Sequence, residues 1–140
     1  MTETPEPPAG FSLSIPAFSG GFSDHNGPYF DGPPDGPLQR AFFALDRHAN
    51  GLGVVHGGML SAFTDSLLAH AVGRATGKIG MTINLSTDFL HMARAGEWVI
   101  GEASMTRATA DFAFAEGRLR VGRRDVVRAS GVFKLMQRRR

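Results

Sequence analysis

The chain has 140 residues, a formal net charge of +2 and no cysteine. That length suits one domain, which buries about two thirds of its unfolded surface, and the lack of cysteine excludes disulfides, thiolate metal sites and a cysteine nucleophile. The first residues do not resemble a signal peptide, and no stretch approaches the roughly 20 apolar residues of a membrane span. We therefore expect a cytoplasmic protein with no membrane partner.

The first 37 residues are expected to form a turn-rich lead-in that packs on the domain. All eight prolines lie at or before Pro37, and proline interrupts regular sheets and helices. A single domain is then predicted over residues 38–140. Its first element is the short apolar run 41–46, which is typical of a strand.

Glycines interrupt the next stretch, and a helix is predicted from Gly58 to about Arg74. Its apolar positions run nearly all the way round, as in a buried helix. From residue 79 the period changes to two, which predicts a long half-buried strand. One face of that strand carries Ile79, Met81, Ile83, Leu85 and Phe89, and the other carries Thr82, Asn84, Ser86 and Asp88.

Three further strands are predicted at residues 98–107, 112–121 and 126–136. Short turns separate all of these strands, so we expect successive strands to be antiparallel neighbours. The predicted fold class is α+β, with one long buried helix followed by an antiparallel meander.

Charge is distributed unevenly along the chain. Residues 1–93 contain four Lys or Arg and eight Asp or Glu, a net charge of −4, whereas residues 94–140 contain eleven and five, a net charge of +6. A basic half is typical of proteins that bind a polyanion or a phosphorylated small molecule, although surface arginines also serve solubility alone. Nucleic acid is not expected as a partner, because the basic half has no recognition motif.

Two familiar patterns are excluded. The stretch GLGVVHG resembles a dinucleotide-binding fingerprint, but His56 occupies the third glycine position and no alternating strands and helices follow. The five histidines show no ligand spacing on a common helix, so we expect no metal.

The strongest candidate site is the stretch NGLGVVHGGMLSAFTD, residues 50–65. A helix that begins near Gly57 and Gly58 presents free backbone N–H groups and a positive dipole end. Glycines there let a ligand approach closely, so the site is able to polarise a carbonyl and hold an oxyanion. Asp65 lies within the helix in a mostly apolar neighbourhood, where a carboxylate is costly without partners. It is either a general base or nucleophile, or a structural acid.

The pattern N-x-x-G-x-x-HGG, followed by an apolar helix with an Asp, a long strand and a meander, resembles the hotdog-fold acyl-CoA thioesterases. The resemblance covers residues 38–136 and is strongest to the phenylacetate-pathway (PaaI-like) subgroup. It implies a long helix wrapped by an antiparallel sheet of about five to six strands. It also implies a homodimer with the active site at the subunit interface, often paired into a homotetramer.

The resemblance also implies a role for each residue of the site. Asp65 attacks the thioester or activates water, and the Gly57 N–H polarises the thioester carbonyl. His56 orients the loop, Asn50 positions the water or the carboxylate, and the Thr82 hydroxyl positions water.

Coenzyme A carries phosphates, which arginine binds well. Candidate substrate-binding residues are Gly58, Arg107, Arg120, Arg123 and Arg124, together with the arginine tail 138–140.

The resulting hypothesis is hydrolysis of acyl- or aryl-CoA thioesters without a metal or redox cofactor. Two alternatives stay open: a non-catalytic acyl-CoA binding module, and a hotdog enoyl-thioester hydratase in which His56 works with Asp65. The sequence leaves open the acyl group, the choice between nucleophile and base for Asp65, and the choice between dimer and tetramer.

Overall fold

The computed structural model describes residues 2–16 and 19–137. In chain order the elements are β1 (Ser12–Leu13), α1 (Phe22–Asn26), β2 (Tyr29–Asp31), β3 (Leu38–Phe43), the 3-10 turn η1 (Asp46–His48), α2 (Gly57–Thr76), β4 (Ile79–Phe89), β5 (Trp98–Ala108), β6 (Phe112–Val121) and β7 (Arg124–Met136). The arginine tail 138–140, a candidate for phosphate binding, lies outside the described residues.

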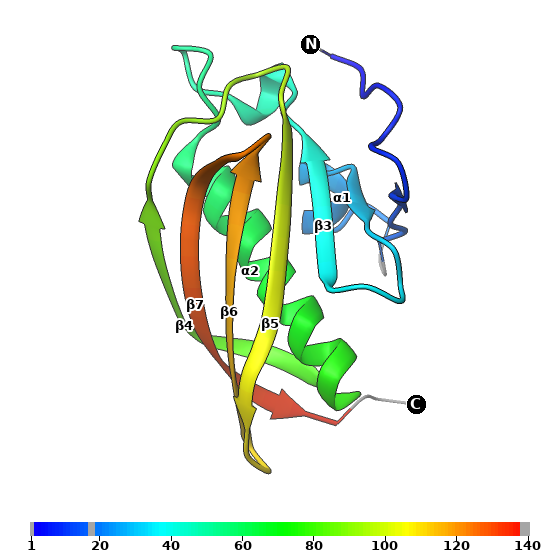
Figure 1. Ribbon diagram of the computed structural model, residues 1–140, viewed down its shortest axis with the longest axis vertical. Coiled ribbons are helices and arrows are strands. Elements are labelled where there is room, and N and C mark those ends of the chain that lie inside the picture. The colour runs from blue at the N-terminus through cyan, green and yellow to red at the C-terminus, as the bar shows by residue number, and fades with distance from the viewer. Residues whose placement is uncertain (1, 17–18, 138–140) are drawn as a thin grey trace.

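The strands form one antiparallel sheet that curves around α2 (Figure 1). Its order is β1-β2-β3-β5-β6-β7-β4, seven strands in all. The predicted α+β architecture is confirmed, but the sheet has more strands than the five or six expected. The additional strands are β1 and β2, which the lead-in contributes to the edge beside β3. The division of the chain at residue 37 stays a prediction.

Helix α2 lies in the concave face of the sheet and is fixed at both ends. His56 is its N-cap, and Gly77 ends it in the left-handed conformation at φ 71°, which glycine adopts without strain. The side chains of Phe63, Leu67 and Leu68 are fully buried against the sheet, and each stabilises the fold by about 1.5–3 kcal/mol. The apolar positions that predicted a buried helix are all buried, and the intervening side chains on the opposite side are partly exposed.

The position of β4 differs from the prediction. Successive strands were expected to be neighbours, but β4 pairs with β7, and β5 pairs with β3 and β6. The segment 90–97 instead crosses one end of the molecule to reach the other half of the sheet (Figure 1). The meander of β5, β6 and β7 is confirmed. The connection was misread because eight residues are long enough to cross the sheet rather than to form a turn.

The burial expected for β4 is also wrong. Ile79, Met81, Ile83 and Phe89 are 46–60% exposed, and only Leu85 of the predicted apolar face packs against the core. A bulge between Thr82 and Asn84 shifts the register with β7. Because a bulge adds a residue, strict alternation fails across it, and Thr82 before it faces α2.

Candidate active site

His56 fixes the first turn of α2. Its backbone N–H donates to the His48 carbonyl at 2.9 Å, and its Nδ1 accepts the Gly58 N–H at 2.8 Å. An Nδ1 that accepts carries no proton, so this ring is in the Nε2–H form. A Cβ at Gly58 would lie 2.9 Å from that Nδ1, so a larger residue there would displace the His56 ring. His56 is therefore the N-cap of α2, and its role in orienting the loop stays a prediction.

Gly57 is the first residue of α2 and is exposed. No hydrogen bond within the described residues uses its N–H, as expected at a helix N-terminus. The ring of Phe89, at the end of β4, lies 3.7 Å from where a Gly57 Cβ would be. The predicted free donor at the helix end is therefore present, beside an aromatic side chain from the edge strand.

Asp65 is half-buried on the flank of α2 that faces β4. Its Oδ1 accepts the hydroxyl of Thr82 at 2.5 Å. Within the described residues its Oδ2 has no partner. The structure thus brings two predicted site residues together and leaves one carboxylate oxygen available.

Asn50 lies in a tight turn before α2. Its Oδ1 accepts the N–H groups of Leu52 at 2.9 Å and Val54 at 3.3 Å, so the side chain stabilises its own loop. It makes no hydrogen bond to Asp65 within the chain. Its role toward water or the carboxylate stays a prediction.

The four arginines are not brought together. Arg120, Arg123 and Arg124 lie at the β6–β7 turn, where Arg124 donates to the Met92 carbonyl at 3.0 Å and pairs with Glu97 at 3.3 Å. Arg124 therefore holds the crossing segment 90–97 against the β6–β7 turn.

Arg107 lies near the β5–β6 turn, which contacts Lys78 just beyond the C-terminus of α2. It is at the far end of the helix from Gly57. Arg120 and Arg123 at the β6–β7 turn are left as phosphate-binding candidates, and Gly58 is a separate candidate in the first turn of α2.

A recess of about 290 Å³ adjoins His56 and Gly58 and was not predicted. Its walls include Phe22 and Asn26 of α1, Arg47 and His48 of η1, and Met59 and Ala62 of α2. The Nε2 of His48 lies 2.7 Å from the Asn26 carbonyl, and burial lowers the pKa of His48. The short helix α1 has no periodicity that would have revealed this contact.

In the described part of the chain, no cluster of His, Cys, Asp or Glu is arranged to hold a metal ion. Neither is any helix there long and apolar enough to cross a membrane.

A helix held in a curved antiparallel sheet, with glycines at its start and a carboxylate on its flank, defines a hotdog-fold protein. The Thioesterase superfamily model matches residues 52–127 of the chain. The chain therefore belongs to the Thioesterase superfamily, and the resemblance noted from its motif is confirmed.

Relatives from two bacteria support this assignment, and a solved structure from a third shares the fold. The Pseudomonas aeruginosa protein named "Putative esterase PA0474" is 37% identical over 64% of this chain and 69% of its own length. A phenylacetic acid degradation-related protein from Ralstonia eutropha JMP134 is 32% identical, with a TM-score of 0.64 over 69% of this chain and 74% of that one. A hypothetical thioesterase from Streptococcus pneumoniae TIGR4, solved with coenzyme A, shares the fold at 17% identity, with a TM-score of 0.71 over 80% and 91%.

Proposed function

We propose that this protein hydrolyses acyl- or aryl-CoA thioesters to a free acid and coenzyme A. The observation that carries the proposal is the Asp65 carboxylate, held at Oδ1 by Thr82 with Oδ2 available, in a chain of the Thioesterase superfamily. Coenzyme A in the Streptococcus pneumoniae structure supports CoA as the carrier. A cytoplasmic location stays a prediction of the sequence.

In the proposed reaction, the thioester carbonyl oxygen accepts the Gly57 N–H. The helix dipole and this donor stabilise the negative charge that develops on the oxygen during attack. Asp65 either attacks the carbonyl carbon, forming an anhydride that water cleaves, or removes a proton from the attacking water. In both routes the carbon–sulfur bond breaks, coenzyme A leaves as the thiolate, and a proton that comes from the water converts it to the thiol.

The Gly57 N–H and the Asp65 carboxylate of one chain cannot both reach the same thioester carbonyl. Asp65 follows Gly57 by eight residues, which is about 12 Å along a helix. Near-attack geometry requires the reacting atoms to lie roughly 3–3.5 Å apart. The spacing supports a site in which Asp65 of one chain faces Gly57, Asn50 and His56 of a second chain.

The edge strand β4 supports that dimer. It carries Asp65's partner Thr82, and its apolar residues Ile79, Met81 and Ile83 are about half exposed or more. An exposed apolar edge strand is a template for pairing with another chain. We propose that β4 pairs with its copy in a homodimer, and that two dimers form a homotetramer.

The test is thiol release from a panel of acyl- and aryl-CoAs by the wild type and by Asp65→Asn. Hydrolysis that falls by orders of magnitude in a folded Asp65→Asn variant supports the proposal. Absence of turnover by the wild type on every thioester overturns it.

The same panel separates the alternatives. Tight binding of acyl-CoA without turnover, unchanged in Asp65→Asn, identifies a binding module. Addition of water to an enoyl-CoA without thiol release identifies a hydratase.

The recess beside His56 offers room for the acyl or aryl group. The size of the acyl group that the protein prefers in the panel should therefore match the size of this recess.

A further inference from the structure

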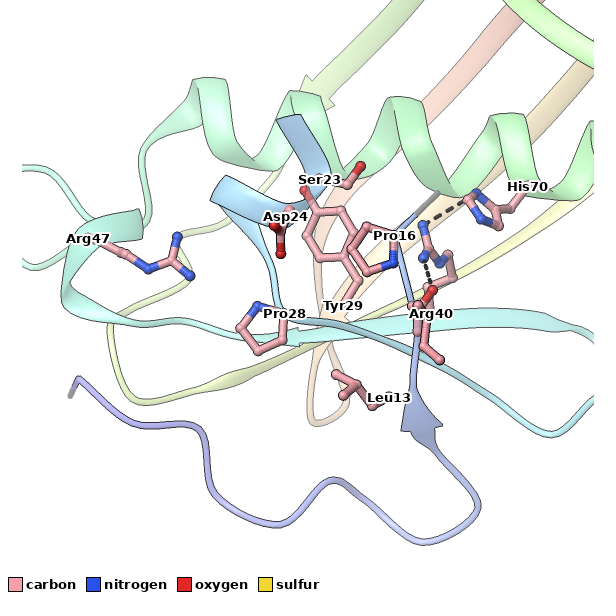
Figure 2. Close-up of a pocket in the computed structure, with 11 residues that line it drawn as sticks. Leu13, Pro16, Ser23, Asp24, Pro28, Tyr29, Arg40, Arg47 and His70 are labelled. Atoms are coloured by element: carbon pink, nitrogen blue, oxygen red, sulfur yellow. Dashed lines mark hydrogen bonds between the residues drawn. The ribbon is translucent and has the colours of Figure 1, made fainter. Parts of the chain in front are cut away.

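A cavity of about 570 Å³ lies between the lead-in and α2 (Figure 2). It is on the β3 flank of the helix, whereas Asp65 faces β4 on the other flank. Its apolar walls include Leu13, Ile15 and Pro28, and its polar lining includes Tyr29, Arg40 and Arg47. The volume is within the range of small-molecule sites, about 300–1,000 Å³. None of the residues assigned to thioester hydrolysis lines it.

Arg40 is a buried cation at one side of this cavity. Only 3% of the residue is exposed, and its Nε donates to Asp31 at 2.8 Å. Its Nη1 and Nη2 donate to the hydroxyls of Ser66 and Ser14. A guanidinium has five N–H groups, so these three bonds leave donor capacity, part of which approaches His70 Nδ1 at 3.3 Å.

Tyr29 supplies a second donor. The residue is 4% exposed, and its hydroxyl has no hydrogen-bond partner within the described residues. Its ring packs against Phe63 and lies 5.2 Å from the Arg40 guanidinium carbon. Burial raises the pKa of the Tyr29 hydroxyl, against the smaller opposing effect of Arg40 and Arg47. The phenol is therefore protonated at neutral pH and free to donate.

The remaining charged groups also favour an anion. Arg47 donates to the backbone carbonyls of His25 and Gly27, and it forms no ion pair with a carboxylate within the described residues. Asp24 is the one acid in the lining, and its Oδ2 already accepts the Gly20 N–H at 2.7 Å. Burial and the Arg40 charge lower the pKa of His70, so that ring is neutral. The lining thus presents two guanidiniums and a phenol, while Asp31 is paired with Arg40 at Nε and Asp24 accepts the Gly20 N–H.

We propose that this cavity binds a monocarboxylate with an apolar body. The carboxylate accepts the Tyr29 hydroxyl and guanidinium N–H groups of Arg40 and Arg47, and the apolar body covers Leu13 and Ile15. A buried donor without a partner is unfavourable, and hydrogen bonds to a charged acceptor are among the stronger ones in proteins. The acid product of the proposed thioester hydrolysis belongs to this class, but the binding itself does not depend on that activity.

Direct binding to the full chain tests the proposal. Tyr29 is the only tyrosine, so selective ¹³C-tyrosine labelling gives NMR signals from this site alone. Octanoate is the probe, with octan-1-ol as the neutral analogue and inorganic phosphate as the anion without an apolar body. We expect saturable shifts of the Tyr29 signals with octanoate, and no comparable shifts with the other two compounds.

Variants make the test specific. Tyr29→Phe keeps the ring and removes the hydroxyl, so calorimetry should show an octanoate Kd about tenfold weaker. Ile15→Glu places a carboxylate at an exposed position of the wall and should weaken octanoate binding through charge repulsion. This variant decides the matter if Tyr29→Phe does not fold. Asp65→Asn should bind octanoate with the wild-type Kd, so failure of hydrolysis and failure of this site are distinguishable.

Three results would overturn the proposal. The first is the absence of Tyr29 shifts at saturating octanoate. The second is equal binding of octanol or phosphate, which would indicate a site without carboxylate recognition. The third is unchanged octanoate affinity in the folded Tyr29→Phe or Ile15→Glu variant.

Discussion

The hydroxyl of Thr82 lies 2.5 Å from Oδ1 of Asp65, and this bond joins the edge strand β4 to the central helix α2. The bond fixes the carboxylate in one orientation, because a single oxygen is occupied. The bulge that follows Thr82 reverses the alternation of β4, so Thr82 before it faces α2 and Leu85 after it packs against the core.

Removing this hydroxyl should impair turnover rather than substrate binding. Thr82→Val keeps the shape of the side chain, and we expect kcat to fall about tenfold with little change in KM, because a hydrogen bond to a charged group is lost. Steady-state thiol release measures both constants. Thr82→Ser retains the donor and should recover most of the rate. Equal kcat for the valine variant and the wild type would show that the bond is not used in the reaction.

Loss of the helix cap should reduce stability. His56→Ala removes the acceptor for the Gly58 N–H, and we expect the free energy of unfolding to fall by about 1 kcal/mol. His56→Asn offers another acceptor of this kind and should restore most of the loss. Urea titration of the three proteins checks this. Alanine and asparagine variants of equal stability would contradict a capping role.

Arg123 and Arg124 are adjacent but should respond differently to substitution. Arg124→Ala removes the bonds to Met92 and Glu97, so we expect a loss of about 0.5–1 kcal/mol of stability, as for a partly exposed ion pair. Arg123 is exposed in the turn, and Arg123→Ala should unfold at the wild-type temperature. If Arg123 binds a CoA phosphate, Arg123→Ala should also raise the KM for the CoA thioester, most strongly at low ionic strength. Thermal unfolding and kinetics on the same samples separate the two effects.

The lowered pKa values of His48 and His70 predict how stability changes with pH. Burial is the main cause that lowers the pKa values of His48 and His70 from their usual 6.5. The unfolded chain therefore binds protons at a higher pH than the folded chain. Stability from these groups is present above pH 6.5 and is lost as the pH falls toward the lowered values.

Urea unfolding at pH 7.5 and 5.5 should reveal this loss. We expect His70→Gln to reduce the difference between the two pH values. An unchanged difference in the His70 variant would contradict the assignment to that side chain.

The exposed edge of β4 predicts a link between assembly and activity. Ile83→Lys places a charge on a residue that is 60% exposed in the single chain, and we expect it to yield monomers without thioester hydrolysis. Ile15→Lys, at a residue that is 87% exposed in the lead-in, is the control for a charge placed elsewhere. Light scattering coupled to size-exclusion chromatography gives the mass, and thiol release gives the activity. An active monomer would contradict a site shared between chains.

Local patterns account for the parts of the fold that the sequence predicted well. Helix α2 begins one residue before the predicted start and ends two after the predicted end, because its apolar period and flanking glycines are local signals. The family resemblance named Asp65 and Thr82 as site residues, but it did not predict the hydrogen bond between them.

The failures concern contacts that no local period encodes. The alternation in residues 79–89 gave no sign of the bulge after Thr82. The apolar residues Ile79, Met81 and Ile83 alternate as if buried within one chain, and a pattern does not specify which chain covers them. The cavity around Tyr29 and Arg40 depends on how the proline-rich lead-in folds back, which sequence period does not describe.

The position of β7 between β6 and β4 has a consequence for biosynthesis. Ile79 pairs with Met136, so β4 leaves the ribosome well before the only strand with which it pairs in the described sheet. Until β7 is made, β4 has no neighbouring strand in the described sheet to pair with. Transiently exposed strands of this kind promote aggregation. The sheet is complete only when the last strand inserts into the gap, so a nascent chain that stops before residue 124 should depend on chaperones.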